Sequence, residues 1–494
     1  MLRIGKLSTL FMSAFLLTAV DASAANLTAN TSSDDCSGGT GGLQECLDVA
    51  VDNGEADTIT LEAGTYSNGT YTYNAAVTAE DFPLTLVSVT PGQALIDGGN
   101  SVQGMDLISS GVGDTNTIFT IQGLAFTGGT AGNGGGLQIS TVDADAVVEN
   151  CEFSTNVATL GAGMDIQSSA SGEIFVRSNL FSGNIADSVG GGAFLVASQG
   201  NVSITANTFD DNDANTFEGG GLSVSVEGGT LVIDGNTFSN NEAVIDGGGF
   251  FVETEGVDIE VIITNNIVFG NQAGGSGGGI GIEIEDQTTT ASLTNNTLFN
   301  NTSQDDGGGI IVFLFEASSL ANIYNNIIFG NTANEDGDDI YTAENDVGAI
   351  ALFNNLYTDF FSECQDGGGS CVTEGGNIVG QDPLFVDSAT GDFHLTADSP
   401  ARDAGDPAAP EMPSTDFDGN PRPDQPGTNP DIGAFEFQVP LPTPSPSPTP
   451  TVGPNPEISG GGCSLAGISS LPVSGWWFGL SALALAAVRW RKRG

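Results

Sequence analysis

Short apolar runs that alternate with polar positions dominate residues 121–358, with the period of two that is typical of β-strands. Examples are VSITA, TLVID and EVIIT, each of which leads into an Asn and then an apolar segment. The region shows no amphipathic helical period. The pattern predicts a chain of short strands that are joined by turns.

The same pattern returns every 28 to 30 residues. In each copy a Phe is followed by an Asn, then by a glycine cluster, and a new strand begins directly after the glycines. The Asn residues that set the register are Asn156, Asn184, Asn212, Asn241, Asn271, Asn301 and Asn331. A fixed period over many copies indicates a repeat architecture, and this unit is too short for a four-stranded propeller blade.

We therefore predict an all-β fold, a right-handed parallel β-helix that forms a single solenoid. Each copy would form one coil of three short strands, stacked about 4.8 Å above the last. The register Asn residues should form a hydrogen-bonded ladder while their own backbone adopts a turn conformation. The matching phenylalanines should stack as an internal apolar column; they are Phe181, Phe209, Phe238, Phe269, Phe299 and Phe329.

Two further features recur in each copy. A second Asn lies five residues before the register Asn, at Asn179, Asn207, Asn236, Asn266, Asn296 and Asn326, and Cys151 fills this slot in an earlier coil. The glycine clusters begin at Gly190, Gly219, Gly247, Gly277 and Gly307. We expect these glycines to allow positive φ and close backbone approach where the chain bends into the next strand.

The start of the mature chain carries a candidate lid for the solenoid. In LQECLDVAVDNG (43–54), Leu43, Cys46, Leu47 and Ala50 share one helical face. A short capping helix there would cover strand edges that otherwise promote aggregation. Two disulfides are predicted from sequence proximity, Cys36–Cys46 and Cys364–Cys371.

Both ends of the chain resemble targeting segments. Residues 1–24 have the layout of a secretory signal peptide with cleavage after Ala24. A Pro-rich linker (438–459) precedes an apolar segment (460–494) that is long enough to span a bilayer and ends in a basic cluster. Between these ends we expect a cap with the first coils (25–120), the repeats (121–358), and the C-terminal coils with a closing module (359–437).

The charge is strongly acidic. The formal net charge is −53, and only Arg177, Arg402 and Arg422 interrupt the acidic part between the two targeting segments. Such a surface repels nucleic acid and anionic lipid. It would attract divalent cations, but plain solubility is the favoured explanation of the acidic charge.

Three stretches resemble known families. FSGNIADSVGGGAF and its copies resemble the repeats of polymorphic membrane proteins, which are surface-exposed β-helical adhesins. LQECLDVAVDNGEADTITLEAGTY resembles the opening of the pectate-lyase-like β-helix superfamily. DPLFVDSATGDFHLTADSPARDAGDP (382–407) and TDFDGNPRPDQPGTNPDIGAFEF (415–437) are similar to the end of choice-of-anchor Q domain proteins, in which this module precedes a surface anchor.

The C-terminal tail also resembles the short sorting signals of Gram-negative bacteria. In these signals a Gly- or Cys-containing motif precedes a membrane span and an Arg cluster, and the motif here would be Gly460–Cys463. The resemblance implies processing or lipid attachment at Cys463, and a permanent transmembrane anchor is the alternative. Either outcome places the protein in the cell envelope or at the cell surface.

The resemblance to lyases raises the question of catalysis. A lyase needs a base, commonly Arg or Lys in that superfamily, and Ca²⁺ held by clustered carboxylates. Arg177 is the only basic residue in the coils and is therefore the one catalytic candidate. The single histidine, His394, lies outside the repeats and is expected to be structural. Asp416, Asp418 and Asn420 have the spacing that opens a calcium loop, but no acidic residue closes it and Arg422 follows, so a turn is expected there.

A set of aspartates falls in or beside the turn between Phe and the glycine cluster. They are Asp210, Asp211, Asp213, Asp246, Asp305, Asp306, Asp336, Asp338 and Asp339. On stacked coils they should share one edge, which could hold Ca²⁺ or consist of solvated loop tips.

These observations favour a surface-anchored, monomeric protein that binds glycans or other surfaces without catalysis. A calcium-assisted polysaccharide lyase and a structural surface-layer component are the alternatives. Nucleic acid is excluded as a partner by the charge, and the membrane is contacted through the C-terminal segment alone.

Overall fold

The structure, a computed structural model, describes residues 25–438 except 33–34, 52, 79, 110, 112, 114–115, 286–287, 316–318, 345–349, 365–370 and 425–427. The chain divides into two units, Met1–Val439 and Pro440–Gly494, and the described residues all belong to the first. Ala24, the Pro-rich linker beyond Gln438 and the tail with Cys463 lie outside the described residues. Within the described part of the chain, no helix has the length and apolar character needed to cross a membrane.

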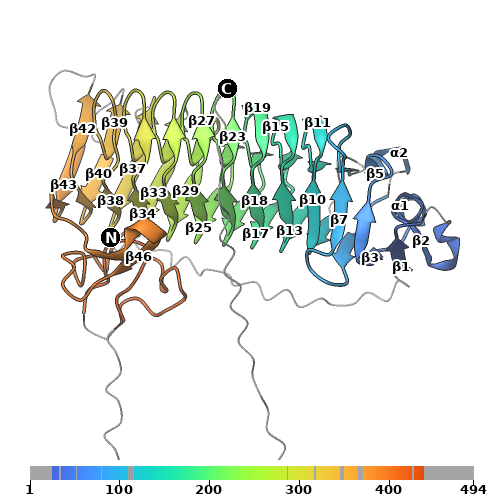
Figure 1. Ribbon diagram of the computed structural model, residues 1–494. Helices are drawn as coiled ribbons and strands as arrows, with labels where there is room; N and C mark the ends of the chain where they lie inside the picture. The colour runs from blue at the N-terminus through green and yellow to red at the C-terminus, as the bar shows by residue number, and fades with distance from the viewer. Residues whose placement is uncertain are drawn as a thin grey trace, which may run out of the picture. The chain divides into compact units, whose positions relative to one another are not determined.

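A parallel β-helix accounts for the chain from Ala25 to Val379, as Figure 1 shows from the side. Its coils run through four sheets, which we number I to IV in the order in which a coil visits them. Three strands per coil were expected, but the middle coils contain a fourth, short strand in sheet III. This extra strand spans only two residues in later coils, such as β23 (Asp213–Ala214), which is too short to leave a strand signal in the sequence.

Sheet I has 14 strands. In spatial order they are β2 (Thr40–Gly42), β1 (Ala25–Asn30), β3 (Asp57–Leu61), β6 (Leu84–Ser88), β9 (Ile118–Gln122), β13 (Asp145–Glu149), β17 (Ile174–Arg177), β21 (Val202–Thr205), β25 (Thr230–Asp234), β29 (Glu260–Thr264), β33 (Thr290–Thr294), β37 (Leu320–Tyr324), β40 (Ile350–Phe353) and β43 (Val372–Gly375).

Sheet II has 12 strands. They are β4 (Gly64–Tyr66), β7 (Ala94–Asp97), β10 (Leu124–Thr127), β14 (Glu152–Ser154), β18 (Leu180–Ser182), β22 (Thr208–Asp210), β26 (Thr237–Ser239), β30 (Ile267–Phe269), β34 (Thr297–Phe299), β38 (Ile327–Phe329), β41 (Leu356–Tyr357) and β44 (Ile378–Val379). The seven strands of sheet III are β11 (Thr130–Asn133), β15 (Val157–Leu160), β19 (Ile185–Val189), β23 (Asp213–Ala214), β27 (Glu242–Ala243), β31 (Gln272–Ala273) and β35 (Thr302–Ser303).

Sheet IV has 11 strands, and its outer face is the candidate binding surface described in the next subsection. They are β5 (Tyr71–Asn74), β8 (Met105–Ile108), β12 (Leu137–Thr141), β16 (Met164–Ser168), β20 (Ala193–Ala197), β24 (Leu222–Val226), β28 (Phe250–Thr254), β32 (Ile280–Ile284), β36 (Ile310–Leu314), β39 (Ile340–Glu344) and β42 (Phe360–Cys364).

The phenylalanine column exists but is shorter than predicted. Phe126, Phe153, Phe181, Phe209 and Phe238 stack inside with ring centroids 4.5–4.9 Å apart and ring planes within 6° of parallel. Phe269 does not continue the column, because Val268 is the residue that pairs with Phe238. Phe269, Phe299 and Phe329 stand two residues before their Asn rather than three, so they point to the outside of sheet II.

The register Asn residues form the predicted ladder at the corner between sheets II and III. In Asn184, for example, the side-chain Nδ2 donates to Phe153 O at 2.9 Å and to Asn212 Oδ1 at 2.9 Å. Asn179 and its equivalents form a second ladder at the corner between sheets I and II, with Cys151 buried in the slot predicted for it. The cysteine is free, and burial raises the pKa of its thiol to about 12.

The prediction that the ladder Asn residues adopt the turn conformation is wrong. Positive φ falls one residue earlier, at Ser178 (56°), Ala206 (55°) and Asn240 (55°) for example. The residue in the left-handed region makes the bend, and the following Asn then points inward to bond the next coil.

The glycine clusters have the two predicted roles. The first glycine of each cluster has positive φ, as at Gly247 (65°) and Gly277 (66°). The following glycine lies against the backbone of the next coil, so that a Cβ at Gly248 would collide with the carbonyl oxygens of Gln272 and Gly278. The clusters thus let the loop between sheets III and IV fold tightly onto its neighbours.

Replacing Gly248 with alanine is expected to lower the free energy of unfolding by about 1–3 kcal/mol, because the added methyl group forces two coils apart. Gly132→Ala is the matched control, since no other heavy atom lies within 4 Å of the place where its Cβ would stand and its φ is not positive. Urea denaturation followed by circular dichroism compares the two. Equal midpoints would contradict the steric role.

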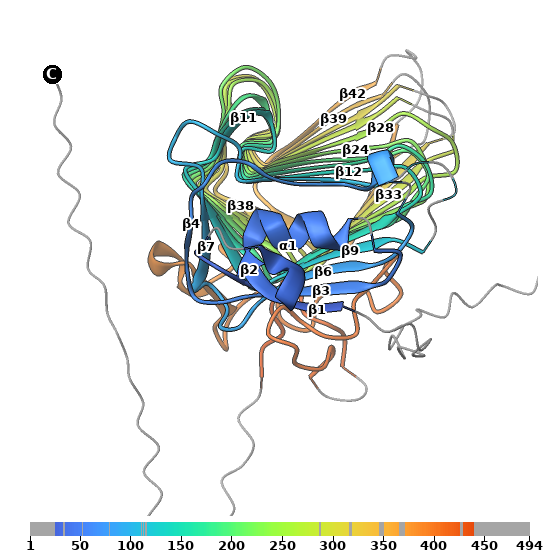
Figure 2. The same cartoon turned by 90° about the vertical axis from the view of Figure 1, so that its right-hand side faces the viewer.

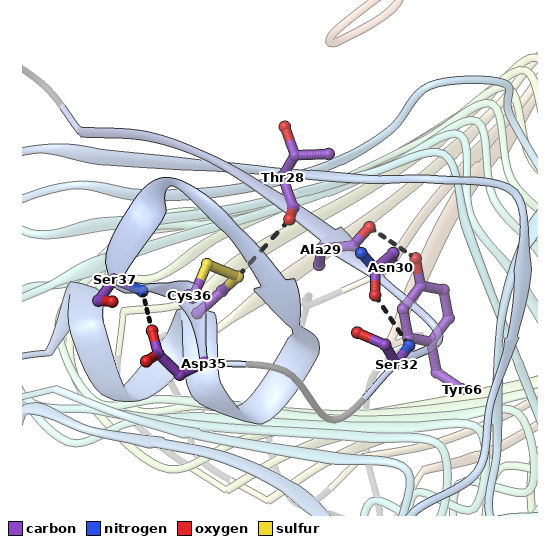
Figure 3. The surroundings of a disulfide bond; sticks show 9 residues. Thr28, Ala29, Asn30, Ser32, Asp35, Cys36, Ser37 and Tyr66 are labelled. Atoms are coloured by element: carbon purple, nitrogen blue, oxygen red, sulfur yellow. Dashed lines mark hydrogen bonds between the residues drawn. A yellow bond between two sulfur atoms is a disulfide. The ribbon is translucent and has the colours of Figure 1, made fainter.

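The lid at the N-terminal end is confirmed. Helix α1 (Leu43–Ala50) buries Leu43, Cys46, Leu47 and Ala50 and lies over the end of the solenoid in Figure 2. The Cys36–Cys46 disulfide joins it to the 3₁₀ helix η1 (Cys36–Gly38) (Figure 3). A short helix α2 (Ala75–Thr78) follows β5. The side chain of Cys364 lies outside those that the structure describes, so the pair Cys364–Cys371 stays a prediction.

The closing module, residues 382–437, packs along the side of the solenoid rather than extending it (Figures 1 and 2). It begins with an antiparallel pair, β45 (Phe385–Asp387) and β46 (Asp392–Leu395), separated by the 3₁₀ helix η2 (Ser388–Thr390). Phe393 contacts the outward-facing rings of Phe269 and Phe299 at centroid distances of 5.2 and 5.5 Å. The phenylalanines that leave the internal column therefore form the apolar seat of this module.

A row of asparagines fixes the module in register. Each occupies the left-handed position at the corner between sheets I and II, and each side-chain Nδ2 donates to a backbone oxygen of the module. The pairs are Asn265 to Thr415, Asn295 to Asp431 and Gly433, Asn325 to Asp406, and Asn354 to Ala404, at 2.9–3.1 Å.

Candidate functional site

Arg177 lies at the end of β17 in sheet I, where it has a structural environment. Its Nε lies 3.3 Å from Glu149 Oε2 on the preceding coil, and its guanidinium carbon lies 5.6 Å from the centroid of the Phe175 ring. A cavity of about 480 Å³ at the neighbouring corner between sheets I and II is lined by Ser178 and Asn179, but not by Arg177. The candidate base is therefore paired with the carboxylate of Glu149.

His394 is held between two carboxylates of the closing module. Its Nδ1 lies 2.6 Å from Asp392 and its Nε2 lies 2.8 Å from Asp418, and its ring stacks on Phe435 at 4.0 Å. Burial lowers the pKa of His394, but the hydrogen bonds and charges of Asp418 and Asp392 raise it by more. Because both nitrogens are engaged, this geometry agrees with the predicted structural role.

The predicted acidic edge is divided in the structure. Asp210, Asp211 and Asp213 lie at the corner between sheets II and III. Asp305 and Asp306 lie in the loop between sheets III and IV, and Asp336 and Asp338 lie in the loop that leads from β38 of sheet II to β39 of sheet IV. Asp339 is fully buried and ends the Asn ladder, since its Oδ1 accepts from Asn331 Nδ2 at 2.9 Å. The prediction that these aspartates share one edge is thus wrong, because they fall at different corners of the coil. Calcium binding stays a prediction.

The turn predicted around Asp416 is present. The backbone N–H of Asp416 donates to Asn420 O at 2.9 Å, and Asp416 Oδ1 accepts from the backbone of Asn420 at 2.7 Å. Arg422 follows in a fully buried pair with Glu436, so this segment stabilises the closing module.

The outer face of sheet IV gathers acidic and aromatic side chains that the sequence analysis did not single out. Two rows of side chains run along it from β28 to β42, and adjacent members face the same side in successive coils. One row contains Glu253, Glu283, Phe313, Ala343 and Glu363, and the other contains Phe251, Gly281, Ile311, Tyr341 and Phe361. We call these two rows the sheet IV face.

The second row is partly covered by the glycine loops that fold over it. Phe251, Ile311 and Tyr341 are buried, whereas Phe361 is 40% exposed. Tyr341 and Phe361 stack with ring centroids 5.6 Å apart, and Tyr341 donates its hydroxyl to Glu363 Oε2 at 2.8 Å. Phe313 stacks with the exposed Phe315 at 6.2 Å. The last coils therefore present Phe315 and Phe361, with Phe313 half-buried, on a face that also carries Glu363, and we call these three rings the aromatic platform.

Acidic groups surround this face, and the sequence contains no Lys or Arg between Arg177 and Arg402. Burial, together with the neighbouring charges of Glu285, Glu253, Asp246 and Glu218, raises the pKa of Glu283 to about 7. Burial and the charges of Asp336, Asp305 and Glu363 likewise raise the pKa of Asp306.

Three of these carboxylates form a compact set. One oxygen each of Glu253, Glu255 and Glu285 lies within 4.8 Å of the others, and no other such group of His, Cys, Asp or Glu occurs among the described residues. Carboxylate oxygens are the ligands that Ca²⁺ prefers, so these residues could hold a divalent cation. None of them belongs to the aspartate set that the sequence predicted.

The raised pKa of Glu283 predicts a pH-dependent stability. The folded state holds the proton up to about pH 7, whereas the unfolded state releases it near the ordinary value of 4.5, so stability falls as the pH rises between these values. We expect Glu283→Gln to raise the melting temperature above pH 7 and to leave it nearly unchanged below pH 4.5. Thermal melts across this range, with Glu152→Gln on sheet II as control, test the sign.

Among the comparisons with known proteins, the match to a family model supports the fold. The model of a family described as "Right handed beta helix region" matches residues 110–313, which supports the right-handed sense of the coil. The crystal structure of pectate lyase Pel9A is 17% identical, with a TM-score of 0.42, and the match covers 84% of this chain and 96% of that one. A PL6 family polysaccharide lyase, Pedsa3628 from Pseudopedobacter saltans, is 10% identical, with a TM-score of 0.31 and coverage of 75% and 96%. No curated protein matches by sequence.

Proposed function

We propose that this protein is an exported, surface-anchored β-helix that binds glycans through the sheet IV face and does not catalyse a reaction. The observation that carries the proposal is the aromatic platform of Phe313, Phe315 and Phe361 on a face that also carries Glu363. Exposed aromatic patches with polar neighbours mark interaction sites, and the carboxylates can accept hydrogen bonds from sugar hydroxyl groups.

The geometry favours binding over the lyase alternative. A calcium-assisted lyase requires its base beside the cation, but Arg177 lies in sheet I and the set of Glu253, Glu255 and Glu285 lies at sheet IV, on another side of the coil (Figure 2). The resemblances of the repeats to those of polymorphic membrane proteins and of the closing module to choice-of-anchor Q domains support a surface location with anchoring through the tail.

Binding of the full-length protein to a panel of immobilised glycans tests the proposal. We expect at least one saturable interaction, and we expect Phe361→Ala and Phe313→Ala to weaken it at least about tenfold, which corresponds to about 1.4 kcal/mol. Phe82→Ala is the control. Phe82 is 36% exposed, close to the 40% of Phe361, but it lies just before β6 near the N-terminal end of the solenoid.

The same preparations distinguish catalysis. Incubation with polygalacturonate and Ca²⁺ should give no rise in the ultraviolet absorbance of unsaturated product. A rise that Arg177→Ala abolishes would establish the lyase and overturn the proposal. Absence of any glycan binding would overturn it as well.

A further inference from the structure

The sheet IV face has a charge pattern that restricts the glycan it can accept. Along the axis of the solenoid, Glu253, Glu283 and Glu363 stand in one row, and Asp246, Asp306 and Asp336 stand in the loops beside it. No basic residue lies in this stretch of the sequence. A uronate polymer would therefore meet only like charge along the face.

Carboxylates also lie close together at one end of this face. One oxygen each of Glu253, Glu255 and Glu285 lies within 4.8 Å of the others. A ligand that carries positive charge would offset their mutual repulsion.

The aromatic platform indicates what kind of cation fits. Phe315 and Phe361, each 40% exposed, and the half-buried Phe313 offer apolar area against which sugar rings can pack. Ring faces also attract ammonium groups, by about 0.5–1 kcal/mol at exposed sites. Small metal ions use only the carboxylates and gain nothing from these rings.

We propose that the sheet IV face binds a linear polysaccharide with free amino groups, such as a glucosamine polymer. The polymer runs along the solenoid axis, its ammonium groups pair with the row of carboxylates, and its sugar rings pack on the platform. The rows extend over five successive strands, from β28 to β42, which matches an extended, repetitive ligand. This inference rests on the proposed glycan-binding function and adds the class of glycan.

The test compares three oligosaccharides by titration calorimetry with the full-length protein at about pH 6, where amino groups are protonated. Glucosamine oligomers should bind at least about tenfold more tightly than N-acetylglucosamine oligomers of the same backbone, a difference of about 1.4 kcal/mol. Galacturonic acid oligomers should not bind. The affinity for glucosamine oligomers should fall as ionic strength rises from about 0.02 to about 0.5 M, because salt screens exposed charges.

Matched variants locate the interaction. Glu363→Gln and Glu253→Gln should reduce the affinity for glucosamine oligomers several-fold and leave the affinity for the acetylated oligomers unchanged. Glu152→Gln, an exposed carboxylate on sheet II, should change neither. Circular dichroism spectra and melting temperatures verify that each variant is folded.

The other outcomes are separable. Equal affinity for the amino and acetylated oligomers would overturn the inference while supporting the proposed glycan binding. Binding of no glycan in the panel would overturn both. Oligolysine could also compete with the glucosamine oligomer for the face. If it bound as tightly as the glucosamine oligomer and Phe361→Ala did not weaken it, the face would be a site for basic peptides, and the inference would be overturned.

Discussion

An Asn241→Leu variant is expected to lose about 3–5 kcal/mol of its free energy of unfolding, because several hydrogen bonds in the core lose one partner each. Asn241 Nδ2 donates to Phe209 O at 3.0 Å and to Asn271 Oδ1 at 2.9 Å, and Asn241 Oδ1 accepts from the backbone and the side chain of Asn212 at 3.1 and 2.9 Å. Leucine has a similar volume but leaves these buried groups unpaired. Chemical denaturation followed by circular dichroism measures the loss.

The adjacent Asn240 is the matched control. It has a φ of 55° and an exposed side chain that donates only to Asp210 Oδ1, at 2.8 Å. Glycine tolerates this backbone conformation, so Asn240→Gly should change the free energy of unfolding by no more than about 0.5 kcal/mol. If both variants unfolded at the same midpoint, the ladder would not have the stabilising role that we assign to it.

Arg422→Ala is expected to destabilise the closing module by about 3–5 kcal/mol, because it leaves buried carboxylates without their cation. The guanidinium is fully buried and lies 3.2 Å from Glu436 Oε2, and it donates to the backbone oxygens of Asp431, Gly433 and Ala434 at 3.0–3.1 Å. Hydrogen exchange of residues 382–437 measures the local loss. The coils N-terminal to the module should keep their protection.

Arg402→Ala distinguishes this role from a general effect of removing positive charge. Arg402 belongs to the same module but lies over the Phe437 ring at 4.0 Å, and its loss should cost about 0.5–1 kcal/mol. The defect of Arg422→Ala should also diminish at low pH, because burial already raises the pKa of Glu436 to about 7 and a protonated Glu436 needs no cation. A defect that is independent of pH would contradict the ion-pair explanation.

The period of the repeat was sufficient to predict the coil, both series of Asn and the glycine turns, because stacking depends only on a constant number of residues per coil. It was not sufficient to place the later phenylalanines. Phe238 and Phe269 look equivalent when the motif is read loosely, but the spacing to Asn changes from three residues to two. In a β-strand, a shift of one residue moves a side chain to the opposite face.

The docking of the closing module also left a signal in the sequence. Asn pairs occur at 265–266, 295–296, 325–326 and 354–355, whereas the earlier coils have Ser178, Ala206 or Gly235 before the ladder Asn. The first Asn of each pair bonds the module and the second continues the ladder. The pairs therefore indicate which coils are covered.

The sheet IV face could not be derived from local sequence. Glu253 and Glu363 become members of one row only through the exact pairing of five strands, and the loops between these strands differ in length. The aspartates that cluster in the sequence fall at different corners of the coil. Proximity along the chain was thus a poor guide to proximity on the surface.

The lateral attachment of the closing module also determines how the molecule bears mechanical load. The chain leaves the described residues at Gln438, directly after this module, so a pull on the C-terminal end acts first on residues 382–437. The module bonds four coils at once through Asn265, Asn295, Asn325 and Asn354. A load on the module is therefore distributed over contacts to four coils rather than carried by the terminal coil alone.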